Sequence, residues 1–443
     1  MRTCAAALVL AVSAVAATVP KHVTFHKDVL PVLQKRCQQC HRPGEAAPVP
    51  FLSYKDARPW AKAIKTAVLS RKMPPWFADP AHGEFVNDRR LTQDEIDTFA
   101  GWADQGAKEG NAKDAPATLS FADGWVMGKP DAVFEMPEAY KVPASGTINY
   151  TWMVVPTNFT EDKWVEKIEV RPGDRAVVHH IVVMAREPGS GYMKNARPGV
   201  PFTPGASKPA KGEDTGRGTF YMLGSGGVEM VGVYVPGGLP YETQPGQARL
   251  IKAGTELLFQ MHYTANGKET MDRSRVGMIF AKEPPKERVV NTFIANPLLR
   301  IPPGDSNAKV MARVPLHTDV TLQSMFPHMH VRGKAMEYRV IYPDGKSEVL
   351  LNVPKYDFNW QISYYLKEPK KLPAGTHFEI TAHYDNSPNN PHNPDPRQEV
   401  RWGDQTWEEM LAAFVDLAIP VGVEPFTIVR PAKKPAASSA GGL

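Results

Sequence analysis

Two histidines separated by one residue, His328 and His330, form the pair whose spacing points most directly to metal chemistry. They lie in Phe-Pro-His-Met-His-Val-Arg-Gly, residues 326–333, in an apolar setting. In an extended strand, alternate side chains leave the same face, so both imidazoles can reach one metal ion. Such a pair can also be an ordinary strand face, so it carries weight only in the company of other ligand-type residues.

Further ligand-type residues occur in the sequence both before and after this pair. One set consists of three imidazoles, from His179, His180 and His262, and the other of two imidazoles and a thioether, from His328, His330 and Met410. Three imidazoles suit copper or zinc, whereas a soft thioether favours Cu(I). The adjacent histidines of the first set would point to opposite faces of a regular strand. Both can therefore bind one metal only at a strand end or a bulge.

The same residues also have structural explanations. His179 and His180 could be a core pair, His262 a hydrogen-bonded strand residue, and Met410 part of a helix core. A separate alternative is a β-sandwich binding module with a zinc or structural metal. His383 is expected to have a structural role or to hold metal-binding residues in place, and not to bind a metal itself.

A different chemistry is indicated by Cys37-Gln-Gln-Cys40-His41. A Cys-x-x-Cys pair alone could be a redox disulfide or half of a zinc site. The histidine that follows makes it the attachment sequence for a c-type haem, in which two thioethers fix the porphyrin and the imidazole is an axial iron ligand.

The surroundings of this motif agree with a haem domain. An apolar pattern over residues 28–36 predicts a short helix before it, and the capping box Thr92-Gln-Asp-Glu95 predicts a second helix that stops at Gly106. Met73, followed by two prolines, is the expected sixth iron ligand, with His26 and His82 as rivals. Residues 20–110 therefore resemble a small, all-α monohaem cytochrome c domain.

The bulk composition describes a multidomain globular chain. It has 443 residues, 42% of them hydrophobic and 22% charged, with a net charge of +5 and no basic stripe, so we expect no nucleic-acid partner. Residues 1–17 have Arg2, an apolar run and Ala14-Val15-Ala16, the form of a secretory signal peptide. We expect secretion across the cytoplasmic membrane into a bacterial periplasm, without a stable membrane span if the signal is cleaved. An uncleaved anchor is the alternative.

After a polar linker at 111–120, short apolar runs separated by Pro and Gly predict an all-β region. Within it, residues 253–263 align without gaps with residues 374–384. We infer two related β-sandwich, jelly-roll-like domains, 121–285 with the first metal set and 286–430 with the second. Residues 431–443 are expected to be a disordered tail.

The order of the six ligand-type residues resembles the copper type II, ascorbate-dependent monooxygenases, the peptidylglycine α-hydroxylating and dopamine β-monooxygenase family. The resemblance covers residues 121–430 and implies one copper ion bound by the three-histidine set. It implies a second copper, at the O₂-activating site, bound by the set that contains Met410. By the same resemblance, His328, His330 and Met410 are the catalytic ligands.

This chain departs from that family in several positions. Its β region contains no cysteine, whereas the animal enzymes are rich in disulfides. Ile181 stands where those enzymes commonly have a methionine. Phe326 stands where the peptidylglycine enzymes hold the substrate carboxylate with an arginine, and Ala412 and Phe414 stand where they use Asn and Tyr. A small apolar or aromatic substrate is therefore expected instead of a peptide C-terminus.

Together these patterns predict a haem–copper monooxygenase that inserts one atom of O₂ into a C–H bond. The expected cofactors are two copper ions and one covalent haem c, with electrons supplied through the haem and/or by ascorbate. A redox donor protein is a further expected partner. The alternative is a non-catalytic protein that relays electrons or handles copper.

Overall fold

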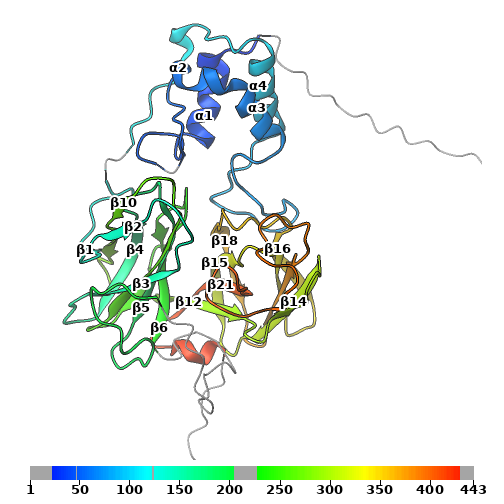
Figure 1. Cartoon of the computed structure of the whole chain (residues 1–443). Helices are drawn as coiled ribbons and strands as arrows, with labels where there is room; N and C mark the ends of the chain where they lie inside the picture. Colours follow the sequence, from blue (N-terminus) through cyan, green and yellow to red (C-terminus); the bar gives the residue numbers. More distant parts are fainter. Residues whose placement is uncertain (1–21, 46, 122–123, 204–226, 430–443) are drawn as a thin grey trace, which may run out of the picture. The chain divides into compact units, whose positions relative to one another are not determined.

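The computed structural model describes residues 22–45, 47–121, 124–203 and 227–429. The expected signal peptide and the tail from 431 lie outside these residues. The chain divides into two compact units (Figure 1). Of the described residues, the first unit comprises those up to Pro75 together with Arg89–Ser120, and the second comprises Trp76–Asp88 and those from Phe121 onward. Among the described residues, no helix is long and apolar enough to cross a membrane.

The first unit holds the α-helices of the described chain, and they are few and short. They are α1 (Leu30–Arg36), α2 (Tyr54–Ala57), α3 (Ala61–Leu69) and α4 (Gln93–Asp104), with a π-turn at Phe25–Val29 and 3₁₀ turns at Arg58–Trp60 and Ala112–Asp114. The predicted capping box is confirmed: the Thr92 hydroxyl accepts from Glu95 N, and the Glu95 carboxylate accepts from Thr92 N. The predicted helix over 28–36 instead starts as the π-turn before α1.

The second unit is mostly β-sheet, which confirms the expected β-sandwich character. In its first half, one sheet has the order β3-β9-β5-β6 and the other β1-β11-β4-β8, with a hydrophobic core between them. The bounds are β1 (Ala132–Glu135), β2 (Tyr140–Val142), β3 (Thr151–Pro156), β4 (Lys163–Arg171), β5 (Val178–Arg186), β6 (Val228–Tyr234), β7 (Tyr241–Glu242), β8 (Gln247–Ile251), β9 (Glu256–Tyr263), β10 (Thr270–Asp272) and β11 (Arg275–Phe280).

The second half repeats this plan, with the sheets β14-β19-β16-β17 and β12-β21-β15-β18 around a separate core. The bounds are β12 (Glu287–Ala295), β13 (Arg300–Ile301), β14 (Ala308–Pro315), β15 (Val320–His328), β16 (Gly333–Ile341), β17 (Ser347–Val353), β18 (Tyr364–Leu372), β19 (His377–Tyr384), β20 (Val400–Arg401) and β21 (Ala412–Pro420), before a 3₁₀ turn at Pro425–Ile428. A short parallel pairing of β8 with β12 makes one continuous sheet across the two halves.

The aligned segments at 253–263 and 374–384 occupy equivalent places. Each supplies the second strand of its four-stranded sheet, β9 in one and β19 in the other. The turn before each strand is held in the same way: Ala253 N donates to Asp162 Oδ1 at 2.8 Å, and Ala374 N donates to Asp319 Oδ1 at 2.7 Å. Strand position and turn contact therefore repeat together.

Residues Trp76–Asp88, which we call the strap, differ from the expectation for 20–110. They group with the β unit and not with the helices. Trp76 and Phe85 are buried against Tyr364, at ring distances of 5.0 and 5.4 Å. Val86 N donates to Tyr365 O, and Lys367 N donates to Glu84 O. Large aromatic side chains and unpaired backbone at the edge of β18 explain why the strap leaves the helical unit.

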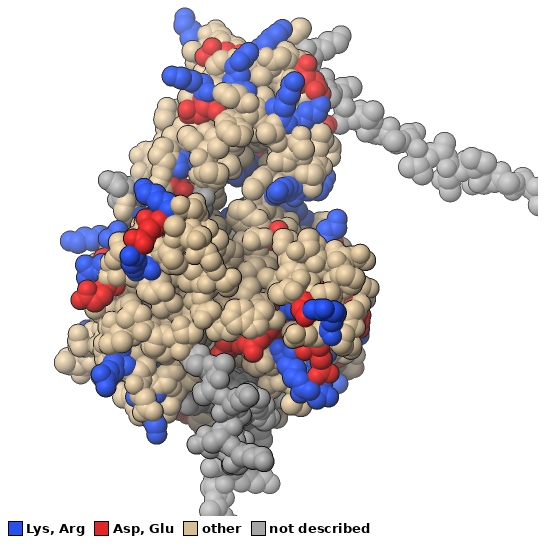
Figure 2. All heavy atoms as spheres, in the orientation of Figure 1, with Lys and Arg blue, Asp and Glu red and all other residues tan. Residues whose placement is uncertain are grey.

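Lysine and arginine side chains are interspersed with acidic ones on the face drawn in Figure 2. No single-sign stripe covers that face, in line with the charge pattern of the sequence.

Candidate metal centres

The three histidines of the first set meet at one point. The side chains of His179, His180 and His262 have ligand nitrogens that all lie within 4.8 Å of one another. Their ring centroids are 4.8–5.3 Å apart. His180 and His262 are buried, and His179 is partly exposed. The sequence-predicted first set is therefore brought together by the fold.

A bulge explains how adjacent histidines reach the same point. His180 stands directly opposite His262 on the antiparallel pair β5 and β9, and the register shifts between Val178 and His180. His179 is the extra residue in that shift, so its side chain is turned out of strict alternation. The predicted requirement for a bulge is confirmed.

The free nitrogens of this cluster fit a metal. Nε2 of His179 and Nδ1 of His262 are buried without any hydrogen-bond partner, which is costly unless another ligand satisfies them. Nδ1 of His179 lies 3.1 Å from Nδ1 of His180. Burial lowers the pKa of His179 to about 4 and that of His262 to about 3. All three rings therefore stay neutral near pH 7, the state in which imidazole binds metals.

In the second set, the two histidines are oriented by neighbours. Nδ1 of His328 lies 2.6 Å from Gln361 Oε1, and Nδ1 of His330 lies 3.1 Å from the Glu408 carbonyl. When each Nδ1–H donates to its oxygen, each Nε2 is left for a metal. Burial lowers the pKa of His328 to about 4 and that of His330 to about 3. Gln361 was missed in the sequence, because no pattern ties it to the pair.

Met410, the third predicted ligand of the second set, lies on the chain segment next to the strand that carries His328. It precedes β21, in which Ala412 is paired with His328. Because side chains two residues apart share a face, Met410 lies on the face of Ala412 and Phe414, and it packs in the same apolar cluster. Two of the predicted ligands of the second set, His328 and Met410, are thus placed on the same face of the paired strands β15 and β21.

Glu409 ties the segments of the second set together. Its buried carboxylate accepts from the main-chain N–H of His330 at 2.8 Å, Arg332 at 2.6 Å and Met410 at 3.3 Å. Burial raises its pKa to about 8. The sequence contains Glu-Glu-Met, but no local pattern shows that Glu409, and not the half-buried Glu408, is the buried member of the pair.

The two sets of histidines lie next to each other in the second unit. Tyr150 has ring distances of 4.6 Å to His262 and 6.5 Å to His330. Phe358 lies 5.4 Å from His179 and 6.3 Å from His330. Proximity of His328 and His330 also contributes to the low pKa of His180, after burial and the other two histidines of its own set. Both aromatic rings were missed by sequence reasoning, because their positions follow from tertiary packing alone.

The Cys-x-x-Cys-His motif follows α1 as a single turn. The N–H groups of Cys40 and His41 both donate to the Cys37 carbonyl, at 3.1 and 2.9 Å. Nδ1 of His41 lies 2.8 Å from the Val49 carbonyl, which leaves Nε2 for an iron. Burial raises the pKa of Cys37 to about 12, and neither cysteine is in a disulfide. A thiol with a raised pKa is a poor nucleophile.

The remaining predicted residues are distributed between the units. Met73 and His26 belong to the helical unit, and His82 belongs to the strap. His26 Nε2 lies 3.4 Å from Glu109. His383, on β19, lies in the other sheet of its sandwich, and its buried Nδ1 has no hydrogen-bond partner. The three-histidine cluster does not include it.

Comparison with known proteins adds no family. No family model matches the chain, and no curated protein matches it. Among solved structures, the major capsid protein P2 of bacteriophage PM2 is 9% identical, with 65% of this chain and 97% of that chain covered at a TM-score of 0.25. An allantoicase structure is 9% identical, with 56% and 79% covered at a TM-score of 0.15. Likenesses this low carry no inference.

Proposed function

We propose that the chain is a copper-dependent monooxygenase that hydroxylates a C–H bond of a small apolar or aromatic substrate with O₂. Two coppers would be held, one by His179, His180 and His262, and one by His328, His330 and Met410. The observation that supports this most is the cluster of neutral imidazoles with buried, unpartnered nitrogens beside a second, pre-oriented histidine pair.

The donor chemistry distinguishes the two sites. Three imidazoles suit copper in either oxidation state, and a thioether favours Cu(I). When bound, copper would supply the one-electron steps that O₂ reduction needs and that redox-inert zinc does not offer. The residues of the chain hold the rings neutral, fix which nitrogen is free and exclude water by burial.

The N-terminal unit fits the role of electron entry in this proposal. Cys37, Cys40 and His41 would hold one haem c, with Met73 as sixth ligand, in a cytochrome c-like domain. Haem iron carries one electron at a time, which matches copper sites that each take one. Ascorbate remains a second candidate reductant, and a periplasmic location would suit both.

The decisive experiment is oxygen incorporation. Copper-loaded protein is reduced anaerobically, mixed with ¹⁸O₂ and a panel of small apolar and aromatic compounds, and the products are analysed by mass spectrometry. One ¹⁸O atom per product molecule is expected. His330→Ala should abolish the product. His383→Ala, at a half-buried histidine in the other sheet, should retain it.

The second candidate is a non-catalytic electron-transfer or copper-handling protein. His180, His262 and His330 are buried. This favours the second candidate, because a hydrophobic shell that shields a metal from solvent is typical of electron-transfer sites. In that case the metals and haem would be reduced and reoxidised in the same experiment with no ¹⁸O in any organic product.

A further inference from the structure

The second half of the β unit repeats the framework of the three-histidine site, which is a bulged strand paired with a strand that carries a histidine. In the first half, β5 and β9 pair His180 with His262, and their register shifts just before His180. In the second half, β16 and β19 pair Ala335 with His383, and their register shifts just before Ala335. The strand order is also the same, β3-β9-β5-β6 in one sheet and β14-β19-β16-β17 in the other. The framework is therefore present twice.

The histidine that both halves share has the same open nitrogen. His383 corresponds to His262 in the ungapped alignment of residues 253–263 with residues 374–384. Nδ1 of each ring is buried and has no hydrogen-bond partner. A buried polar atom of this kind is costly unless a bound group satisfies it. The repeated open nitrogen indicates that the second framework also receives a ligand.

The other positions of the second framework differ in charge. The extra residue of the bulge is His179 in the first half and Lys334 in the second, and the residue after it is a histidine in the first half and Ala335 in the second. On the other side of His383, β14 places Lys309 directly opposite. One imidazole between two lysines does not gather a metal cation, because ammonium groups repel it and have no lone pair to donate. The same three groups suit an anion.

A groove with a volume of about 520 Å³ lies over this face of the sheet. Lys309, Lys334 and His383 line it. Lys334 Nζ reaches across to the start of β14, where it donates to Asn307 Oδ1 at 3.0 Å and to the Ser306 carbonyl at 3.1 Å. Both of these oxygens are neutral, so the hydrogen bonds hold the ammonium group in place without balancing its charge. The groove therefore has room for a small molecule and a fixed positive charge.

The acidic side chains of the groove stand away from the lysines. Glu337 lies one cross-strand row beyond the row of Lys309, and Glu379 lies two rows beyond it. Rows on one face are about 7 Å apart, because each is two residues further along a strand. Glu337 also forms an ion pair with Arg339 at 2.9 Å. Met311, in the row between, is 40% exposed and offers an apolar surface.

We propose that this groove binds a small organic carboxylate. The carboxylate group would lie among Lys309, Lys334 and His383, and the apolar part of the molecule would lie against Met311. The groove is thus a counterpart of the first metal site, in which a lysine replaces one imidazole and an anion replaces the metal ion. The inference needs neither copper nor haem, so it is independent of the proposed function.

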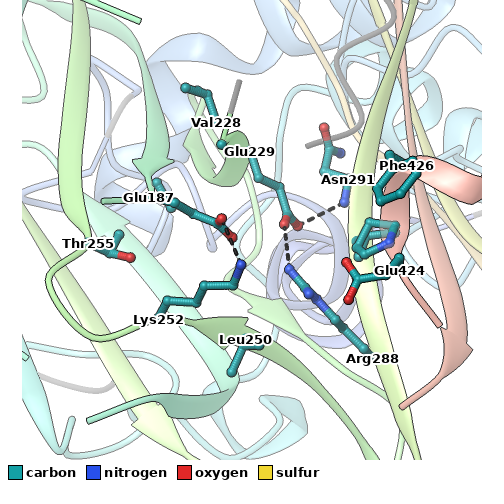
Figure 3. Close-up of a pocket in the computed structure, with 14 residues that line it drawn as sticks. Glu187, Val228, Glu229, Leu250, Lys252, Thr255, Arg288, Asn291, Glu424 and Phe426 are labelled. Carbon is teal, nitrogen blue, oxygen red and sulfur yellow. Dashed lines mark hydrogen bonds and ion pairs between the residues drawn. The ribbon is translucent and has the colours of Figure 1, made fainter. Parts of the chain in front are cut away.

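A crevice elsewhere in the β unit shows the opposite arrangement of charge (Figure 3). Lys252 is paired there with Glu187 at 2.8 Å, and Arg288 faces Glu229 at 3.7 Å. The charged groups point at one another across the space, so the cations already have counter-charges. We expect no carboxylate to bind there. Lys252, whose side chain is 43% exposed, therefore provides a control lysine.

The first test is calorimetry on the full-length protein in low-salt buffer. Benzoate is compared with benzamide, which has the ring without the charge, and with acetate, which has the charge without the ring. We expect benzoate to bind about tenfold more tightly than either, because it alone offers both a charged acceptor and an apolar body. Lys309→Met, Lys334→Met and His383→Ala should each weaken benzoate binding about threefold or more. Lys252→Met removes the same charge elsewhere and should leave it unchanged.

The second test restores the missing imidazoles. Lys334→His combined with Ala335→His would place three histidines on the second framework, as in the first. Both positions have room for the change, since Lys334 is exposed and Ala335 is half-buried. We expect the double variant to bind one more Cu(II) ion than wild type, measured by titration with electron paramagnetic resonance. His383→Ala in the same background should remove that additional ion.

The outcomes are distinct from those of the oxygen-incorporation experiment. Equal binding of benzoate and benzamide would overturn the carboxylate assignment, and so would a loss in Lys252→Met as large as that in Lys309→Met. A double variant that binds no more Cu(II) than wild type would overturn the equivalence of the two frameworks. If benzoate binds as expected and no ¹⁸O enters any product, the groove assignment stands and the monooxygenase function does not.

Discussion

The main-chain N–H of His330 donates to the Glu409 carboxylate at 2.8 Å, and that carboxylate also accepts from the N–H of Met410. A single buried side chain therefore holds both the strand extension and the loop that carry the second candidate metal site. Neither segment has regular secondary structure at that point.

Glu409→Ala should destabilise the protein by about 3 kcal/mol or more, because buried N–H groups lose their acceptor at about 1–3 kcal/mol each. It should also weaken metal binding at the second site. Chemical denaturation and copper titration measure the two effects. Glu408→Ala is the matched control, since only its side chain changes and the carbonyl that meets His330 remains. Equal losses in both variants would contradict the role of Glu409.

Metal content should be two coppers per chain. Met410→Leu keeps the volume of the side chain and removes the sulfur, so the second site should lose Cu(I) affinity at least tenfold. The three-histidine site should remain full. Elemental analysis after dialysis against a graded Cu(I) chelator measures both. Zinc in place of copper, or unchanged Cu(I) affinity in Met410→Leu, would refute the ligand assignment.

The metal-free protein should lose stability as the pH falls from about 6.5 toward 4. In the folded state, burial lowers the pKa of His179 and His328 to about 4 and that of His262 and His330 to about 3. The unfolded chain binds those protons near pH 6.5, so in this window these four histidines make it hold more protons than the native state. Glu409 acts in the opposite direction, because burial raises its folded pKa to about 8, but it offsets only one of these protons. Each histidine contributes a slope of at most about 1.4 kcal/mol per pH unit.

Denaturant midpoints between pH 7.5 and 4.5 measure this pH dependence. His262→Gln should flatten the profile by one proton, and His392→Gln, at an exposed loop position, should not change it. A profile that is equally steep in His262→Gln would mean that acid sensitivity originates elsewhere. Bound copper should shift the loss to lower pH, because protons then compete with the metal.

The strap should be an integral part of the β unit. Trp76→Ala should cost about 3–5 kcal/mol, the usual effect of truncating a buried large aromatic side chain. Trp60→Ala is the control, since Trp60 is 44% exposed in the helical unit. Limited proteolysis and thermal unfolding of the full chain measure the effect. Retention of full stability in Trp76→Ala would show that the strap only rests on β18.

The haem assignment predicts covalent pigment and electron delivery. Cys37→Ala should abolish one thioether bond, which mass spectrometry of the haem-bound peptide detects. Met73→Ala should change the axial ligation and so the haem potential, and it should slow haem reoxidation by O₂ and substrate in stopped-flow traces. Copper content should be unchanged. Product formation at the normal rate while the haem stays reduced would exclude it as the donor.

Much of the local structure was decided by sequence alone. Thr92 and Glu95 form a capping box wherever a helix starts behind them, because the bonds join residues three apart. The repeated turn before β9 and β19 is of the same kind, since the aligned sequences impose the same backbone conformation. The bulge at His179 could be deduced because two adjacent side chains cannot otherwise share a face.

Tertiary structure decided the relations between distant segments. Gln361, Glu409, Tyr150 and Phe358 surround the candidate sites only because separate strands and loops pack there, and no local period marks them. The strap belongs to the β unit because Trp76 and Phe85 are buried against Tyr364. The Arg249–Asp416 pair likewise joins residues 167 apart. Local hydrogen bonds and the alternation of side chains in a strand depend on residues close in sequence, so they can be predicted from short segments. Burial and charge pairing depend on which distant segments pack together, so they follow only from the tertiary structure.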